Sequence, residues 1–144
     1  MKVTFLGTGT SQGVPVIGCP CNVCRSMDYR DKRLRSSIYL EVSGKSFVID
    51  SGPDFRQQML REQIKKLDAI IFTHGHKDHI AGLDDVRAFN FLHSMDMPVF
   101  GNEEVLRQLQ VEFHYAFGQL RYPGTLQLQL NEIGEDVFEA SGVR

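Results

Sequence analysis

The chain has 144 residues, a formal net charge of −2, a sequence pI near 6.2 and 42% hydrophobic residues. This length and apolar content suit one globular domain, and the weak charge gives no electrostatic footprint for nonspecific nucleic-acid binding. No apolar run reaches membrane-spanning length and no secretory signal precedes Met1, so we expect no membrane partner and a cytoplasmic location.

Short β-branched runs and period-two alternation predict strands. In chain order they cover residues 2–6, 37–42, 45–49, 67–72, 97–100 and 126–130. The second and third are joined by Ser43-Gly44, a pair that suits a hairpin turn. The last alternates leucine with glutamine and should be half-buried.

Helices are predicted between these strands. An apolar stripe predicts one over about residues 54–66, after Asp50-Ser51-Gly52-Pro53 ends the preceding strand. Residues 80–86 have the pattern of a helix start, and Asn102 is a suitable N-cap for a further helix. Strands alternating with helices predict an α/β fold with a mixed sheet.

The segment Thr73-His74-Gly75-His76-Lys77-Asp78-His79 places four candidate metal ligands within six residues. It follows a predicted buried strand, so the ligands lie at the carboxyl end of a strand, where α/β sheets place their chemistry. Side chains two apart in an extended segment point the same way, which allows His74 and His76 to bind one ion. Asp78 and His79 come where the chain turns into a helix and are able to face a second ion. We interpret the segment as a metal site.

All three cysteines of the chain, Cys19, Cys21 and Cys24, fall within six positions. This spacing is typical of a structural zinc knuckle. A disulfide fits less well because three is an odd number, and unbound core thiols are the remaining alternative. Clustered, reduced cysteines agree with a cytoplasmic location.

The order His-x-His-x-Asp-His resembles the signature of the metallo-β-lactamase superfamily. The resemblance implies an αββα sandwich with two metal ions at the edge of two facing sheets. It assigns His74 and His76 to the first ion and Asp78 and His79 to the second, with Asp78 as the catalytic ligand. The imidazole and carboxylate donors suit Zn, Mn or Fe. Two such ions would generate a hydroxide nucleophile near neutral pH.

The loop Gly7-Thr8-Gly9-Thr10-Ser11-Gln12-Gly13-Val14-Pro15, followed by the cysteine cluster, is similar to a narrower branch of that superfamily. This branch contains the phosphoribosyl 1,2-cyclic phosphate phosphodiesterases. The resemblance implies that the cysteines hold a structural zinc, whose fourth ligand is a histidine from the carboxyl-terminal part of the domain.

The superfamily pattern requires three more ligands after His79: a histidine, a metal-bridging aspartate and a final histidine. Only His93 and His114 follow in this chain, and both lie in segments predicted to be helical. We therefore expect residues 1–144 to be the amino-terminal part of a single metallo-β-lactamase domain, with the knuckle-like loop at 19–24 within it. We also expect that this chain alone is inactive.

Asp50 ends a predicted strand at a position where the superfamily carries an acidic residue. The resemblance implies a role in orienting a metal ligand by hydrogen bonding. The other interpretation is a turn residue, which local chemistry favours in Asp-Ser-Gly-Pro. The basic residues between Arg25 and Arg35 are interleaved with aspartates, and we expect a solvated, self-neutralising loop there.

The sequence thus predicts a metal-dependent hydrolase that acts on a small or cyclic phosphodiester. Its expected cofactors are two divalent ions, Zn or Mn, and one structural Zn. One alternative is a nuclease of the tRNA 3′-processing type, although those enzymes lack the cysteine cluster. The other is a non-catalytic metal-binding fragment. A half sandwich would leave Leu126, Leu128 and Leu130 without full cover, so we expect association into a homo-oligomer.

Overall fold

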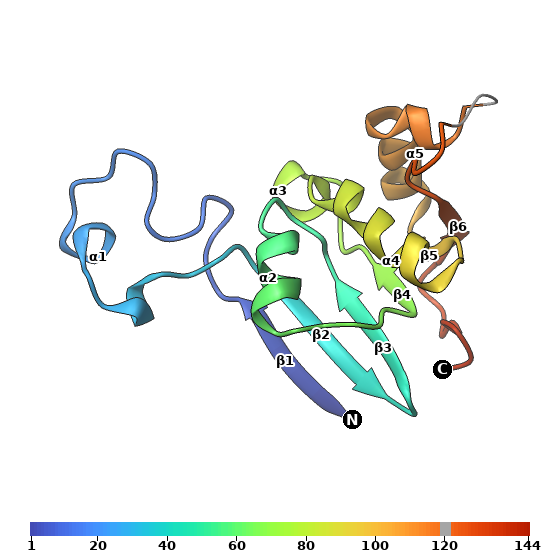
Figure 1. Cartoon of the computed structure of the whole chain (residues 1–144), viewed down its shortest axis with the longest axis horizontal. Coiled ribbons are helices and arrows are strands. Elements are labelled where there is room, and N and C mark those ends of the chain that lie inside the picture. Colours follow the sequence, from blue (N-terminus) through green and yellow to red (C-terminus); the bar gives the residue numbers. More distant parts are fainter. Residues whose placement is uncertain (119–121) are drawn as a thin grey trace.

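The computed structural model describes residues 1–118 and 122–144, whose strands form one six-stranded mixed sheet in the order β1-β2-β3-β4-β5-β6 (Figure 1). The strands are β1 (Lys2–Gly7), β2 (Ser37–Val42), β3 (Lys45–Ile49), β4 (Ala69–Ile71), β5 (Met97–Gly101) and β6 (Leu128–Glu132). The first three pair antiparallel, and β3 to β6 pair parallel. This arrangement confirms the predicted α/β class.

Short helices connect the strands. The α-helices are α1 (Asn22–Arg25), α2 (Phe55–Arg61), α3 (Lys77–Ile80), α4 (Arg87–His93) and α5 (Glu103–Glu112). Three 3₁₀ turns accompany them: η1 (Tyr29–Asp31), η2 (Leu83–Val86) and η3 (His114–Ala116). The predicted N-cap is confirmed, because the Asn102 side chain accepts a hydrogen bond from the amide of Val105 at 2.9 Å.

The hairpin of β2 and β3 forms as the sequence predicts. Val42 pairs with Lys45 across the turn, and both turn residues have positive φ, 51° at Ser43 and 75° at Gly44. Two successive left-handed residues match the right-handed twist of the flanking strands. The hairpin therefore fixes the register of β3, whose end carries Asp50 to one edge of the sheet.

One face of the sheet carries the helices and the main core. Phe55 of α2, Phe89 of α4 and Leu109 of α5 are buried in one cluster with strand residues such as Val48 and Ile70. Removing such side chains from water stabilises the layer by about 1.5–3 kcal/mol each. One sheet with helices on a single face is one half of an αββα sandwich.

Two predicted helix boundaries are wrong. The helix expected over residues 54–66 ends at Arg61, because Gln63 takes a left-handed conformation, φ 53°, that turns the chain toward β4. The helix expected to start at Ile80 instead begins with α3 at Lys77. As a result, Asp78 and His79 both lie within the single turn of α3, whose N-cap is His76.

The opposite face of the sheet has a smaller core. Phe47, Ala69 and Phe100 are buried there with Ala140 of the carboxyl-terminal segment. The leucines expected to lack cover lie elsewhere: Leu126 is 0% and Leu128 7% exposed, both within the main core, and Leu130 packs partly against it. The expectation is therefore wrong for Leu126 and Leu128, because both turn toward the helix-bearing face, whereas Leu130 is only partly covered.

Residues 8–36, between β1 and β2, form an extension that we call the cysteine arm (Figure 1). Its base is paired by reciprocal backbone hydrogen bonds between Val14 and Arg33, at 2.8 and 2.9 Å. Beyond that pair the arm leaves the sheet, and α1 buries none of its residues. Local contacts, rather than the main core, therefore shape the outer part of the arm.

Candidate metal centre

The predicted metal motif, residues 73–79, forms a tight connection from β4 into α3, which we call the histidine turn. β4 lies between parallel neighbours β3 and β5, so their carboxyl ends share one edge of the sheet. Asp50 follows β3 at the same edge. The sheet thus brings Asp50 together with candidate ligands that follow it by 24 or more positions in the chain.

The imidazole rings of the histidine turn lie close together. The ring centroids are 3.9 Å apart for His74 and His79, and 4.7 Å apart for His74 and His76. The carboxylate of Asp78 also approaches His79, with 3.2 Å between Oδ2 and Nε2. Four donors that the sequence predicts to bind metal are therefore neighbours.

Asp50 connects the residues of this site through hydrogen bonds to its carboxylate. It is 5% exposed, and its carboxylate accepts hydrogen bonds from the Thr73 amide at 2.9 Å and the Thr73 hydroxyl at 2.8 Å. His79 Nδ1 lies 2.7 Å from the same carboxylate. Because a carboxylate only accepts, His79 donates from Nδ1, and its Nε2 is the nitrogen that faces the Asp78 carboxylate at 3.2 Å.

The same reasoning assigns the tautomer of His74. Its Nδ1 lies 3.0 Å from Thr73 Oγ1, whose proton is already donated to Asp50. The threonine oxygen must then accept from His74 Nδ1, which leaves Nε2 of His74 as the free donor atom. Neutral imidazoles held at Nδ1 by an acceptor are typical of metal ligands, so this donor set fits a divalent ion.

Two glycines allow the backbone to pack tightly beneath the histidine turn. A Cβ atom on Gly52 would lie 2.0 Å from the carbonyl oxygen of Asp78, and one on Gly82 would lie 2.0 Å from that of Gly52. No side chain fits at either position without moving the backbone. The Gly82 amide also donates to the carbonyl of Ser51 at 2.8 Å. The segment after Asp50 therefore supports α3 directly.

A cavity of about 360 Å³ opens beside the histidine turn, between it and α5. Its lining consists of residues from these two elements: His74, Gly75, His76, Lys77, Asn102, Glu104, Val105 and Gln108. A ligand held at the imidazoles would extend into this cavity and meet the polar face of α5.

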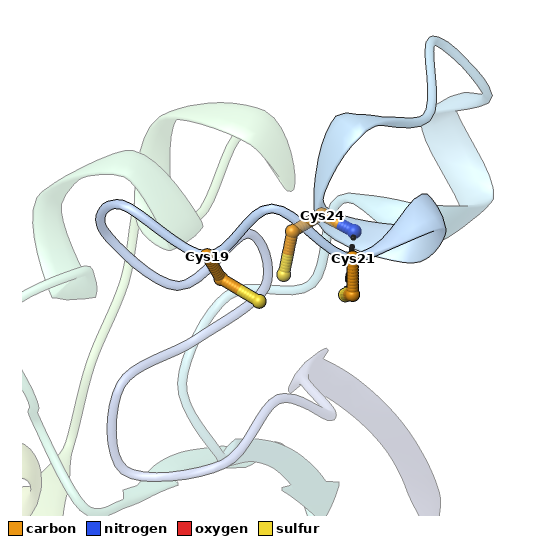
Figure 2. A group of neighbouring side chains, drawn as sticks. All are labelled: Cys19, Cys21 and Cys24. Atoms are coloured by element: carbon orange, nitrogen blue, oxygen red, sulfur yellow. Dashed lines mark hydrogen bonds between the residues drawn. The ribbon is translucent and has the colours of Figure 1, made fainter.

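The three cysteines converge at the outer end of the arm (Figure 2). Their sulfur atoms all lie within 4.8 Å of one another. The Val16 amide donates to the Cys24 sulfur, and the Cys24 amide to the Cys21 sulfur, each at 3.4 Å. No disulfide joins them, since all three are free thiols. This set of converging sulfurs fits one zinc ion, which thiolates bind strongly.

The surroundings of the thiols shift their acidity in opposite directions. The Cys24 amide, together with the thiols of Cys19 and Cys24, lowers the pKa of Cys21. At Cys24 the amide of Val16 lowers the pKa, but the neighbouring Cys19 thiol and burial outweigh it, so the pKa is raised. Cys21 is therefore the first of this pair to become a thiolate as pH rises.

The sulfur atoms of the three cysteines lie closer together than the donor atoms of the histidine turn. Within residues 1–118 and 122–144, no second group of three or more His, Cys, Asp or Glu donors is as close together as the thiols. The two other histidines lie outside both sites: Nε2 of His93 is 3.0 Å from the carbonyl of Lys65, and His114 is exposed at the start of η3. Neither joins the histidine turn.

The sequence interpretation missed several residues that shape the site. Thr73, Gly52, Gln108 and Glu112 were not singled out, although Thr73 directly precedes the motif. In the basic loop Arg30 pairs with Asp28 at 2.6 Å, as expected, but Arg35 pairs at 2.9 Å with Asp54, which lies outside the loop. Among the described helices, none is long and apolar enough to cross a membrane.

Comparison with known proteins finds a matching family and similar solved structures. The family described as "Beta-lactamase superfamily domain" matches residues 45–142. The crystal structure of a diphosphatase from the PhnP family superposes with a TM-score of 0.85 at 45% identity, covering 95% of this chain and 52% of that one. Zinc-bound PqqB from Methylobacterium extorquens has a TM-score of 0.73 at 23% identity, covering 97% of this chain and 48% of that one, which shows a shared fold.

One protein that is similar in sequence is named as a transferase rather than as a hydrolase. A Porphyromonas gingivalis protein named octanoyltransferase is 44% identical over 138 residues, which is 95% of this chain but 28% of that protein. Most of that relative lies outside the match. The chain likewise spans about half the length of the solved relatives, 52% and 48%.

Proposed function

The chain belongs to the metallo-β-lactamase superfamily of hydrolases, and from that premise we propose that it supplies the metal-binding half of an enzyme that hydrolyses a small or cyclic phosphodiester. The observation that carries the proposal is the hydrogen-bonded set Asp50, Thr73, His74 and His79, in which one carboxylate orients two imidazole rings beside a cavity that His74 and His76 line. Two divalent ions, Zn or Mn, are the proposed cofactors there. A structural zinc is proposed at the cysteine cluster.

The proposed roles follow from the contacts. His74 and His76 would hold one ion, and Asp78 and His79 the second. Such ions, when bound, supply a Lewis acid and lower the pKa of water to near neutrality. Asp50 contributes by keeping Nδ1 of His79 protonated and by fixing the ring with a 2.7 Å hydrogen bond. Thr73 links Asp50 to His74, so one carboxylate orients two ligands.

The choice of a phosphorus-containing substrate is supported by the PhnP-family diphosphatase at 45% identity and by the cysteine cluster. A diphosphate and a phosphodiester share the bond that is broken, between phosphorus and a bridging oxygen. The octanoyltransferase name supports no acyl transfer here, because the match covers only 28% of that protein.

The test uses the protein purified from its own cells, with its intact mass determined and with Mn²⁺ or Zn²⁺ added. Its hydrolysis of bis(p-nitrophenyl) phosphate, a cyclic ribose phosphate, a diphosphate, a thioester and a β-lactam is compared. We expect turnover of the phosphodiesters, and loss of turnover in Asp78→Ala. A preference for the thioester or the β-lactam would overturn the phosphodiesterase proposal, and a preference for the diphosphate would reassign its substrate.

A further inference from the structure

Helix α5 contacts the two residues of the histidine turn that separate its ligands. A Cβ atom on Gly75, between His74 and His76, would lie 3.2 Å from Cγ of Gln108. Lys77, between His76 and Asp78, forms an ion pair with Glu112 through its ammonium group. The intervening residues thus face α5, on which Gln108 and Glu112 lie one turn apart.

Glu112 joins these two contacts. Its Oε1 accepts a hydrogen bond from Nε2 of Gln108 at 2.8 Å, and its Oε2 accepts from Lys77. The hydrogen bond from Lys77 lowers the pKa of the Glu112 carboxyl, so the group is ionised at neutral pH. One carboxylate on α5 therefore holds the side chain of Lys77 and the amide group of Gln108, whose Cβ and Cγ lie beside Gly75.

The helix that carries Glu112 is itself fixed. Val105 and Leu109 of α5 are 2% and 0% exposed in the main core, and Asn102 caps the first turn. Gly101, just before the cap, ends β5, so α5 keeps a constant position relative to the sheet edge. A contact to α5 therefore restrains the histidine turn in addition to the hydrogen bonds from Asp50.

We propose that Glu112 is a positioning residue for the metal site, which holds residues 75–77 through Gln108 and Lys77 so that the ligands on either side are ordered before metal binds. The inference rests on the proposed metal site of the histidine turn. A partly exposed ion pair of this kind ordinarily changes stability little. Here the lysine lies between two ligands, so freeing it adds an ordering cost to metal binding.

The experiment is a Mn²⁺ titration followed by the electron paramagnetic resonance of free Mn²⁺. Mn²⁺ is chosen because it prefers imidazole and carboxylate donors over the thiolates of the arm. Wild type, Glu112→Ala, Lys77→Ala and the double variant are compared, with Glu103→Ala as a control that removes an exposed acid from the same helix. Thermal unfolding of each variant reports whether the fold is kept.

We expect each single variant to bind Mn²⁺ about 3- to 10-fold more weakly, less than the 10–100-fold typical of direct partners of a ligand. The double variant should bind no more weakly than Glu112→Ala, because Lys77→Ala removes only a contact that Glu112→Ala already removes. Glu103→Ala should bind as wild type does.

Different outcomes distinguish failure of the positioning role from failure of the proposed metal site. Equal Mn²⁺ affinity in wild type, Glu112→Ala and Lys77→Ala, with binding still lost in His74→Ala, overturns the positioning role alone. Additive losses in the double variant also overturn it. Wild-type binding that His74→Ala leaves unchanged removes the proposed metal site and this inference with it. Lys77 is largely exposed, so Lys77→Ala decides the question even where Glu112→Ala unfolds.

Discussion

The cysteine arm and the histidine turn hold their candidate ligands in different ways. The three thiols come from six consecutive positions and converge on an extension that lies apart from the sheet (Figures 1 and 2). The ligands of the histidine turn are also close in sequence, but Asp50, Gly52 and α5 determine their arrangement. The arm is thus a local structure, whereas the histidine turn depends on the tertiary fold. Perturbing the sheet edge should therefore affect only one of the two sites.

The largest effect is expected from Gly52→Ala. The new Cβ would lie 2.0 Å from the carbonyl oxygen of Asp78, so α3 must move away from the strand end. We expect a loss of about 3 kcal/mol or more in the free energy of unfolding. Mn²⁺ binding at the histidine turn should be lost as well, while zinc binding by the arm is retained. Denaturant unfolding and metal analysis measure both changes.

The matched control is Gly134→Ala, because a Cβ on Gly134 would meet no atom within 4 Å. That variant should unfold like wild type. Equal stability of Gly52→Ala and Gly134→Ala would contradict the close packing of Asp78 on Gly52.

A second, smaller effect is expected from Asp50→Asn. Asp50 has φ 62°, a conformation that asparagine tolerates, so the substitution changes charge and hydrogen bonding with little backbone strain. The amide cannot accept from Thr73 and His79 as the carboxylate does. We expect Mn²⁺ affinity at the histidine turn to fall about 10- to 100-fold. Isothermal titration with Mn²⁺ measures it, and unchanged affinity would leave Asp50 as a turn residue only.

These dependences explain which parts of the fold could be predicted from sequence. The hairpin of β2 and β3 was predicted because its turn chemistry and alternation are local. The end of α2 was not, because the apolar stripe continues past Arg61 while Gln63 adopts a left-handed turn. Ile64 still packs against the core from that turn, so its apolar character was no evidence for helix.

The candidate sites show the same division. The cysteine spacing and the histidine motif could be recognised in the sequence because each occupies one short segment. Glu112 was not visible, since it lies 35 positions from Lys77 and becomes relevant only when α5 packs beside the histidine turn. The role of Gly52 was equally hidden, because it depends on the approach of a backbone 26 positions away.

A third prediction tests the independence of the arm. Cys24→Ser should remove the zinc bound by the arm but change the free energy of unfolding of the metal-free chain by no more than about 0.5 kcal/mol, because α1 buries no residue. Zinc content by mass spectrometry and denaturant unfolding provide the two measurements. Mn²⁺ affinity at the histidine turn serves as the internal control and should stay constant. A substantial loss of stability would show that the arm is coupled to the sheet.

The smallest expected difference lies within the arm. The amide of Cys24 and two neighbouring thiols lower the pKa of Cys21, whereas the pKa of Cys24 is raised. Alkylation requires the thiolate, so in metal-free protein at neutral pH iodoacetamide should modify Cys21 faster than Cys24, by about 3-fold or more. The rate for Cys21 should rise with a midpoint below the ordinary thiol pKa of about 8.5, and that for Cys24 above it. Peptide mass spectrometry over a pH series resolves the two.

Zinc supplies the control for that measurement. Because a metal ion takes up the thiolate lone pairs, added Zn²⁺ should slow alkylation of both residues and reduce the difference between them. The Gly52→Ala variant should show the same rates as wild type, with and without zinc, because its displaced α3 lies outside the arm. Faster reaction of Cys24 would contradict the hydrogen-bond arrangement among the sulfurs. Altered rates in Gly52→Ala would instead show that the arm depends on the sheet edge.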